Sequence, residues 1–244
     1  MSLLEVSGLR KRFGGLVAVA GLDLSMTDGE MLGLIGPNGA GKTTVFNLLS
    51  GFLAPDGGEI LFGGRSVVGL KPHEICRLGM ARTFQIVRPF PQLSVLDNVK
   101  VAALARHPAM PAALEAARAV VERVGLGPRA LSLASGLTLA DRKRLELARA
   151  LATEPALLLL DEVMAGLNAT EIDAMVRLVS GINAGGISVL LIEHNMRAVM
   201  SLSHRIVVLS FGEKIAAGPP REVAADRRVI EAYLGEEYVH PAQA

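Results

Sequence analysis

The stretch that decides the fold is MLGLIGPNGAGKTT, residues 31–44. It opens with a short apolar run at residues 31–36, which predicts a buried strand. A glycine-rich turn follows, and residues 43–52 then show helical spacing. Strand, turn and helix in this order predict a phosphate-binding loop, because backbone N–H groups and a helix N-terminus then surround an anion.

The turn, GPNGAGKTT, matches the pattern G-x-x-x-x-G-K-[ST]. Glycines let the backbone wrap a phosphate closely, Lys42 supplies a charge for the β- and γ-phosphates, and the Thr43 hydroxyl suits Mg²⁺. A turn that only reverses the chain would not need this strand and helix around it. The residues expected to bind the nucleotide are Gly36, Pro37, Asn38, Gly39, Ala40, Gly41, Lys42, Thr43 and Thr44.

A second apolar run, LLLLDE at residues 157–162, ends in two carboxylates. Ligands of parallel sheets bind at the carboxyl ends of the strands, so Asp161 is placed to reach Mg²⁺ directly or through water. Glu162 is placed to orient or deprotonate the attacking water. Carboxylates after strands also serve as helix caps, but the phosphate loop in the same chain favours the metal interpretation.

Strands and helices alternate along much of the chain, which implies a parallel sheet covered by helices on both faces. After a helix at about 140–152, strands are expected at 156–161, 187–194 and 205–210, with helices between them. Two earlier segments, 3–8 and 17–25, alternate as half-exposed strands do.

The composition narrows the class of protein further. The chain has 244 residues, half of them hydrophobic, and 25 basic against 24 acidic residues, so nothing demands nucleic acid as a partner. Cys76 is the one cysteine, which rules out an internal disulfide and is compatible with a reducing cytoplasm. The N-terminus does not read as a signal peptide, and no run approaches the roughly 18 apolar residues of a membrane span.

Several further stretches occur in a characteristic order, namely LRKRFGGLVAV, ARTFQ, LELARAL, AGLN, LIEHNM and VIEAYLGEE. With the two motifs above, they make the chain resemble ATP-binding-cassette ATPases, and more narrowly the ATPase subunits of bacterial branched-chain amino-acid importers. The resemblance implies that ATP and Mg²⁺ are the cofactors. It also implies ATP hydrolysis coupled to transmembrane transport.

The resemblance implies an α/β P-loop NTPase fold, with a RecA-like parallel sheet core, an N-terminal antiparallel β subdomain and an inserted α-helical subdomain. Residues 1–85 are expected to form the first part of the core with the β subdomain. The helical subdomain is expected at 86–136, the second part of the core at 137–215, and a C-terminal extension at 216–244.

Three more roles follow from the resemblance. Phe13 matches the aromatic residue that stacks on adenine, although a strand-edge Phe also packs on a core. Gln85 matches the glutamine that senses Mg²⁺ and the attacking water, although alone it reads as a solvated loop residue. His194 matches the histidine that contacts the γ-phosphate, although such a histidine is often structural.

The family's signature, L-S-G-G-Q, is replaced here by LTLAD at residues 137–141. In the family, two subunits sandwich ATP, and each signature caps the γ-phosphate held by the other. Thr138 keeps a hydroxyl and Ala140 keeps an N–H but adds a methyl group, while Asp141 favours the helix dipole yet would repel a phosphate. Either LTLAD is a working variant, or this half-site is weak and a different subunit supplies an intact signature.

The implied partners are transmembrane permease subunits, a second ATPase subunit and, indirectly, an extracytoplasmic solute-binding protein. The implied location is peripheral, at the cytoplasmic face of the inner membrane. Residues 86–136 are the candidate docking surface, where Phe90 and Leu93 either meet a partner helix or pack on the core. Asn168, in AGLN, is expected to contact the second subunit.

Other classes of protein fit the sequence less well. A soluble ATP-binding-cassette ATPase without a transport role is the main alternative, although such proteins usually carry two cassettes or long insertions. A P-loop GTPase is disfavoured because no N-K-x-D motif is present, and a small-molecule kinase would be separated from it by nucleotide preference. A regulatory binder without turnover is disfavoured by the intact motifs. The sequence leaves the transported solute open among branched-chain and other amino acids, urea and small organic acids.

Overall fold

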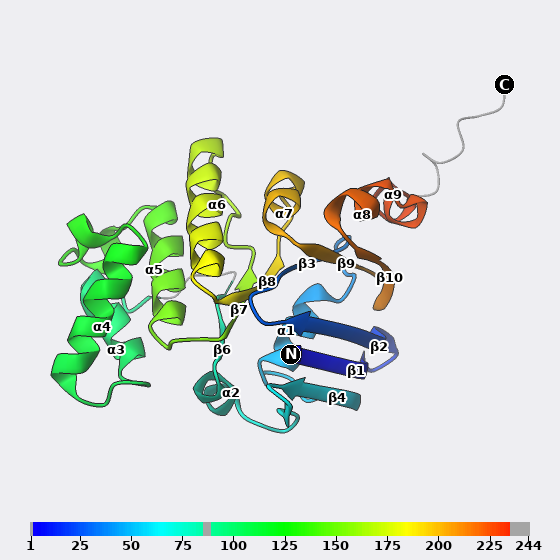
Figure 1. Cartoon of the computed structure of the whole chain (residues 1–244), viewed down its shortest axis with the longest axis horizontal. Coiled ribbons are helices and arrows are strands. Elements are labelled where there is room, and N and C mark those ends of the chain that lie inside the picture. The colour runs from blue at the N-terminus through cyan, green and yellow to red at the C-terminus, as the bar shows by residue number, and fades with distance from the viewer. Residues whose placement is uncertain (1, 85–88, 235–244) are drawn as a thin grey trace. The chain divides into compact units, whose positions relative to one another are not determined.

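The computed structural model describes residues 2–84 and 89–234. Its contacts divide the chain into two compact units. The first unit comprises Met1–Pro72 and Ser188–Ala244, and the second comprises His73–Ile187. Each unit is described by itself below, with the element labels of Figure 1.

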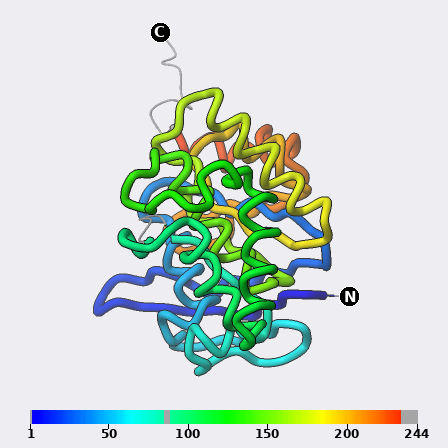
Figure 2. The backbone as a smooth tube through the Cα atoms, turned by 90° about the vertical axis from the view of Figure 1, so that its left-hand side faces the viewer, coloured from blue at the N-terminus to red at the C-terminus, as the bar shows by residue number. Residues whose placement is uncertain are grey.

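The first unit contains an antiparallel sheet with the strand order β2-β1-β4-β5. Its long hairpin, in blue in Figure 2, turns at Gly14 and Gly15. Along the first strand, Leu4 and Val6 are buried whereas Glu5 between them is exposed, as expected for a sheet with one solvated face. The strands are β1 (Ser2–Phe13), β2 (Leu16–Thr27), β4 (Gly57–Phe62) and β5 (Arg65–Ser66).

Parallel strands form the rest of the first unit. The strand β3 (Met31–Ile35) lies between β8 (Ser188–Ile192) and β9 (Arg205–Ser210) and is parallel to both. Every residue of β3 and β8 is buried, which explains their continuous apolar sequences. The remaining elements are β10 (Glu213–Gly218), antiparallel to β9, and the helices α1 (Lys42–Leu49), α7 (Met196–Leu202), α8 (Pro220–Ala225) and α9 (Arg227–Leu234).

The second unit combines two parallel strands with a group of helices. Ala113, Ala117 and Val121 recur every four residues on α4 and are fully buried, so the helix packs closely against α3 and α5. The elements are α2 (Pro72–Leu78), β6 (Met80–Arg82), α3 (Val95–Ala103), α4 (Met110–Arg123), α5 (Leu139–Leu151), β7 (Leu157–Asp161) and α6 (Ala169–Ala184), with short 3₁₀ turns at Gly127–Arg129 and Ala134–Gly136.

The predicted α/β fold with parallel strands is confirmed, and the elements expected from the sequence are present. The sequence did not predict α2, β5, β6, β10, α8 and α9, and it assigned the residues of β5 to a turn. These elements are short, so they offer no more than two turns of helical spacing or a few strand residues. In the described ranges, every helix falls short of the length and apolar character that crossing a bilayer requires.

Two phenylalanines provide a matched test of the core behind the phosphate loop. Phe46 on α1 is fully buried, whereas Phe52, just beyond the same helix, is 51% exposed. We expect Phe46→Ala to lower the free energy of unfolding by about 3–5 kcal/mol because it leaves a cavity. Phe52→Ala should lower it by about 0.5 kcal/mol. Urea unfolding of both variants measures this difference, and equal losses would contradict the described core.

Candidate nucleotide site

The phosphate loop joins β3 to α1, and close backbone packing fixes its two outer glycines. A Cβ at Gly36 would lie 2.0 Å from the carbonyl oxygen of Leu209, and one at Gly41 would lie 2.3 Å from that of Ala18. Gly41 is also the N-cap of α1 and has a φ of 101°. Any side chain at either position would therefore displace the loop.

Lys42 is the first residue of α1 and is only 6% exposed. Its Nζ donates hydrogen bonds to the carbonyl oxygens of Gly36 (2.6 Å) and Pro37 (3.0 Å). The ammonium group therefore lies against the backbone of the loop, where a phosphate would be bound. Thr43, the predicted metal ligand, is exposed, and Thr44 is half-buried.

The rest of the loop agrees with a binding surface. Asn38 and Gly39 at its tip are exposed, and Ala40 is buried beneath them. The backbone N–H of Gly212, in the turn between β9 and β10, donates to the carbonyl oxygen of Ala40 (3.1 Å). The nine residues predicted at 36–44 thus form a loop and the first turn of α1, and neighbouring strands support the loop.

Phe13 and His194 belong to the same unit as the loop. The Phe13 ring ends β1 and is 46% exposed, as stacking on a base requires, with Lys11 Nζ 5.8 Å from its centroid. His194 is exposed and follows β8, between Ile192 and the start of α7. Because β8 and β3 are parallel neighbours, His194 and the phosphate loop both follow strand ends at the same edge.

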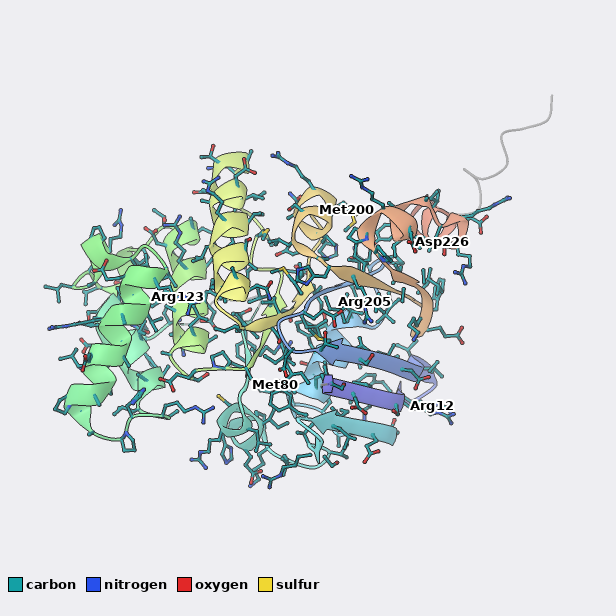
Figure 3. All side chains as sticks on the ribbon, viewed as in Figure 1. Arg12, Met80, Arg123, Met200, Arg205 and Asp226 are labelled. Atoms are coloured by element: carbon teal, nitrogen blue, oxygen red, sulfur yellow. The ribbon has the colours of Figure 1, made fainter. Side chains whose placement is uncertain are left out.

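The C-terminal helix α9 also reaches this loop, which the sequence did not predict. The backbone N–H of Gly36 donates a hydrogen bond to the Tyr233 hydroxyl; burial raises the pKa of Tyr233, and this bond opposes the rise. Tyr233, Ile35 and Met200 (labelled in Figure 3) line an apolar cavity of about 370 Å³ between α7, α8 and α9. Tyr233 lies in the VIEAYLG motif, which indicates the branch of the family but does not predict a contact with the phosphate loop.

In the second unit, Asp161 ends β7 and is 2% exposed. Its Oδ2 pairs with Nη2 of Arg82 at 2.8 Å, and Arg82 ends the neighbouring parallel strand β6. The backbone N–H of Asp161 donates to the Thr83 hydroxyl (3.2 Å). Sequence reasoning missed Arg82, although it stands in the quoted motif ARTFQ. Gln85, in the same motif, lies outside the described residues.

Glu162 follows the strand with a φ of 50°, a left-handed conformation that costs a non-glycine residue about 1–3 kcal/mol. Its carbonyl oxygen accepts a hydrogen bond from Lys143 Nζ at 3.0 Å. Lys143 lies on α5 and is 4% exposed, so this contact is shielded from water. The helix that begins within LTLAD therefore helps to hold Glu162, the predicted catalytic residue, in its unusual backbone conformation.

The LTLAD segment forms the start of α5. Thr138 is the N-cap, and its hydroxyl accepts the backbone N–H of Asp141 at 3.2 Å. Asp141 in turn pairs with Arg129 at 3.1 Å, so its negative charge has a cation beside it. Ala140 is half-buried and Leu139 is 44% exposed. The concern that Asp141 repels a phosphate is thereby reduced.

Asn168 has a local role as well. It is the N-cap of α6, where its side chain accepts the Glu171 backbone N–H and the Glu171 side chain accepts the Asn168 N–H. This reciprocal pair is a capping box. It gives Asn168 a reason to be polar within its own chain, and contact with a second subunit stays a prediction.

Thr43, in the first unit, and Asp161, in the second, are each of the residue types that bind magnesium beside a nucleotide. Within residues 2–84 and 89–234, the acidic residues, histidines and cysteine form no group of three or more that would hold a metal by itself. Thr43 and Asp161 offer a hydroxyl and a carboxylate oxygen. Mg²⁺ prefers such hard oxygen ligands, few in number, and is completed by phosphate oxygens and water.

Comparisons with known proteins agree with these features. The family model described as "ABC transporter" matches residues 19–165, and that described as "Branched-chain amino acid ATP-binding cassette transporter" matches residues 213–239. The high-affinity branched-chain amino acid transport ATP-binding protein LivG of Salmonella typhimurium is 44% identical, with 96% of this chain and 98% of LivG covered. BraF of Pseudomonas aeruginosa, with the same description, is 43% identical over equal shares.

Solved structures give the same result for the fold. A nucleotide-free ATP-binding cassette from an ABC transporter superposes with a TM-score of 0.88 at 28% identity, covering 97% of this chain and all of that one. The ADP conformation of MJ1267, an ATP-binding cassette of an ABC transporter, gives 0.88 at 29% identity over the same shares.

The fold and the phosphate loop thus define an ATP-binding-cassette ATPase. The chain belongs to the ABC transporter family, and it is an ATPase subunit whose hydrolysis is coupled to transport. Within that family it is similar to LivG and BraF along nearly its whole length. The family predicted from the motifs is confirmed.

The buried pair of Arg82 and Asp161 leads to a stability prediction. Removing one partner leaves the other charge buried, so Arg82→Leu should lower the free energy of unfolding by about 3–5 kcal/mol. The double variant Arg82→Leu/Asp161→Leu removes both charges and should recover much of this loss. Urea unfolding of the two single variants and the double variant measures the coupling, and strictly additive losses would contradict it.

The N-cap at Thr138 leads to a second prediction. Thr138→Ala removes the hydroxyl that caps α5 and should cost about 1 kcal/mol, whereas Thr138→Ser keeps the hydroxyl and should cost much less. Thermal unfolding followed by circular dichroism compares the two variants. Equal losses would show that the hydroxyl does not stabilise the helix.

Proposed function

We propose that this protein is the ATP-binding and hydrolysing subunit that energises an importer of branched-chain amino acids, other amino acids or related small polar or organic solutes. The observation that carries this proposal is the similarity to LivG over 96% of the chain. The similarity extends beyond the shared core, since the branch-specific match covers residues 213–239, and the described part of this range contains β10, α8 and α9.

Each site residue receives a role in this proposal. The backbone N–H groups of residues 36–44 and Lys42 bind the phosphates of ATP, and the exposed ring of Phe13 stacks on adenine. Thr43 and Asp161, with Gln85, hold Mg²⁺, which supplies positive charge to the phosphates.

Hydrolysis needs the attacking water to be placed and the charge on the transferring phosphate to be stabilised. Glu162, with Gln85, orients the water, and His194 contacts the γ-phosphate. The support for Glu162 is its position directly after β7, with its backbone held by Lys143. The support for His194 is its place at the same sheet edge as the phosphate loop.

A second ATPase subunit completes the site. Thr138 and Ala140, at the exposed start of α5, are proposed to face the γ-phosphate that this second subunit binds. Whether the second subunit is another copy or a different chain depends on how well LTLAD replaces the usual signature. The pairing of Asp141 with Arg129 supports a working variant.

The remaining partners lie at the membrane. Permease subunits are proposed to dock on the helical subdomain, residues 86–136, where Phe90 is 45% exposed and Leu93 half-buried. An extracytoplasmic solute-binding protein would deliver the solute. The ATPase would then be peripheral at the cytoplasmic face, with its core built from residues 1–85 and 137–215 and a C-terminal extension at 216–244.

Transport in the opposite direction is a second candidate. The lipopolysaccharide export system ATP-binding protein LptB of Acidithiobacillus ferridurans is 35% identical over 97% of this chain. LptB is less similar to this chain than LivG, which is 44% identical, so import is favoured over export.

Uptake measurements test the proposal directly. In cells that lack this chain, we expect uptake of radiolabelled leucine, isoleucine or valine to fall. Supplying the wild-type protein should restore it, and Glu162→Gln, which should bind ATP without splitting it, should not. Normal uptake of all amino acids in the deletion strain, with lipid export impaired, would favour the exporter.

The mass of Glu162→Gln in solution tests the assembly. A dimer with Mg-ATP and a monomer with ADP would mean that LTLAD caps a phosphate and that two copies suffice. A monomer in both conditions, with ATP binding confirmed separately, would point to a different second subunit. Absence of ATP binding by the wild type would overturn the proposed function.

A further inference from the structure

The apolar cavity between α7, α8 and α9 has no part in the ATP binding and hydrolysis described above. Its volume is about 370 Å³, and nine described residues, all in the first unit, line it. Eight of them have apolar side chains, and Tyr233 alone adds a hydroxyl group. Met196, Ile230 and Tyr233 are 36%, 40% and 41% exposed, so a molecule can enter from solvent. The cavity therefore has the size and the lining of a site for a small ligand.

The side chains of α7 and α8 explain why this cavity can accept a ligand. Met196 and Met200 are one turn apart on α7, so both side chains lie on the face that lines the cavity (Met200 is labelled in Figure 3). Unbranched methionine side chains adjust to the shape of what they contact. Across from them, α8 contributes only a methyl group at Ala224. Small and adaptable side chains thus leave room between the helices.

The charges beside the cavity indicate an uncharged ligand. Arg227 of α9 pairs with Glu231 at 2.8 Å, and Arg228 pairs with Asp226, which ends α8, at 2.7 Å. These pairs include every charged residue of α9, so the helix offers no unpaired charge to a ligand. Burying an ionised group against apolar side chains is costly. A carboxylate or a zwitterionic amino acid therefore fits poorly, whereas a hydrocarbon fits well.

Two walls of the cavity continue into the nucleotide site. Ile35 ends β3 and directly precedes Gly36, the first residue of the phosphate loop. Met196 is the first residue of α7, two positions after His194. Between them, Asn195 caps the helix, and its side chain accepts a backbone N–H of α7 at 3.0 Å. A molecule that contacts Ile35 and Met196 therefore restrains the backbone on both sides of the phosphate site.

We propose that this cavity is an effector site for an uncharged, hydrocarbon-like molecule of about ten carbon atoms. The size follows from the volume, since an apolar cavity of about 150 Å³ holds the six carbons of benzene. The ligand restrains Ile35 and Met196 before ATP arrives, so ATP binding has less of the chain to order and becomes tighter. By reciprocity, ATP tightens binding of the ligand by the same factor. This ligand is separate from ATP and from the transported solute.

Naphthalene, which has ten carbons and no charge, is the probe for the site. We expect calorimetry to detect its binding to the wild type, and the methyl resonances of Met196 and Met200 to shift. Ala224→Trp fills the cavity from α8 and should weaken binding by about tenfold or more. Ala225→Trp is the matched control, because Ala225 is exposed on the same helix and lies outside the lining, so its effect should stay below about twofold.

A matched ligand tests the chemical class. Naphthoate has the same rings with a carboxylate, and it should bind about tenfold more weakly than naphthalene. Absence of naphthalene binding, equal losses in Ala224→Trp and Ala225→Trp, or tighter binding of naphthoate or leucine would overturn the site. A wild type that is a dimer without nucleotide, with a monomeric Ala224→Trp, would show instead that a second copy of the chain covers the cavity.

The ATP affinity of Glu162→Gln tests the effector role, because this variant should bind ATP without splitting it. Saturating naphthalene should lower the Kd for Mg-ATP by about fivefold, and Mg-ATP should lower the Kd for naphthalene equally. In Ala224→Trp/Glu162→Gln, naphthalene should leave the Kd for Mg-ATP unchanged. An unchanged Kd for Mg-ATP in Glu162→Gln, with naphthalene bound, would overturn the effector role. A protein that binds naphthalene but no ATP would instead overturn the proposed function.

Discussion

The site depends on the absence of a side chain at two glycines of the phosphate loop. Gly36 and Gly41 stand where a Cβ would meet a carbonyl oxygen of β9 or β2 at 2.3 Å or less. The loop between them is therefore pressed against strands that come from opposite ends of the chain. Because those strands hold it, the N–H groups at the start of α1 are arranged before any phosphate arrives, and binding need not order them.

The charged side chains buried around Asp161 and Glu162 are likewise constrained by their surroundings. Asp161, Arg82 and Lys143 are each nearly inaccessible, and each has a partner of opposite charge or a carbonyl oxygen at 2.8–3.0 Å. Such groups contribute little net stability, yet they are costly to leave unpaired. Their value lies in holding one arrangement, which a site that places a water molecule requires.

Local patterns allowed much of this to be predicted. The phosphate loop can be predicted from residues 31–44 because strand, glycines and helix are adjacent in sequence. The carboxylate site can be predicted from LLLLDE because two acidic residues directly follow an apolar strand. Arg82 and Asp161, which form an ion pair, are 79 residues apart in the sequence. The contact of Tyr233 with Gly36 joins the last described helix to the phosphate loop. Pairings of this kind follow from sheet order and helix packing, which a single sequence does not specify.

The LTLAD segment illustrates how a departure from a motif is to be judged. From the sequence alone, Asp141 is expected to place a negative charge near a bound phosphate. In the structure that carboxylate lies in the first turn of α5, where the helix dipole favours it, and Arg129 pairs with it. The Thr138 hydroxyl keeps a lone pair and its proton after capping, so it remains able to donate to an anion. The electrostatic argument against this half-site is therefore weaker than the steric one, which falls on the methyl group of Ala140 and the exposed side chain of Leu139.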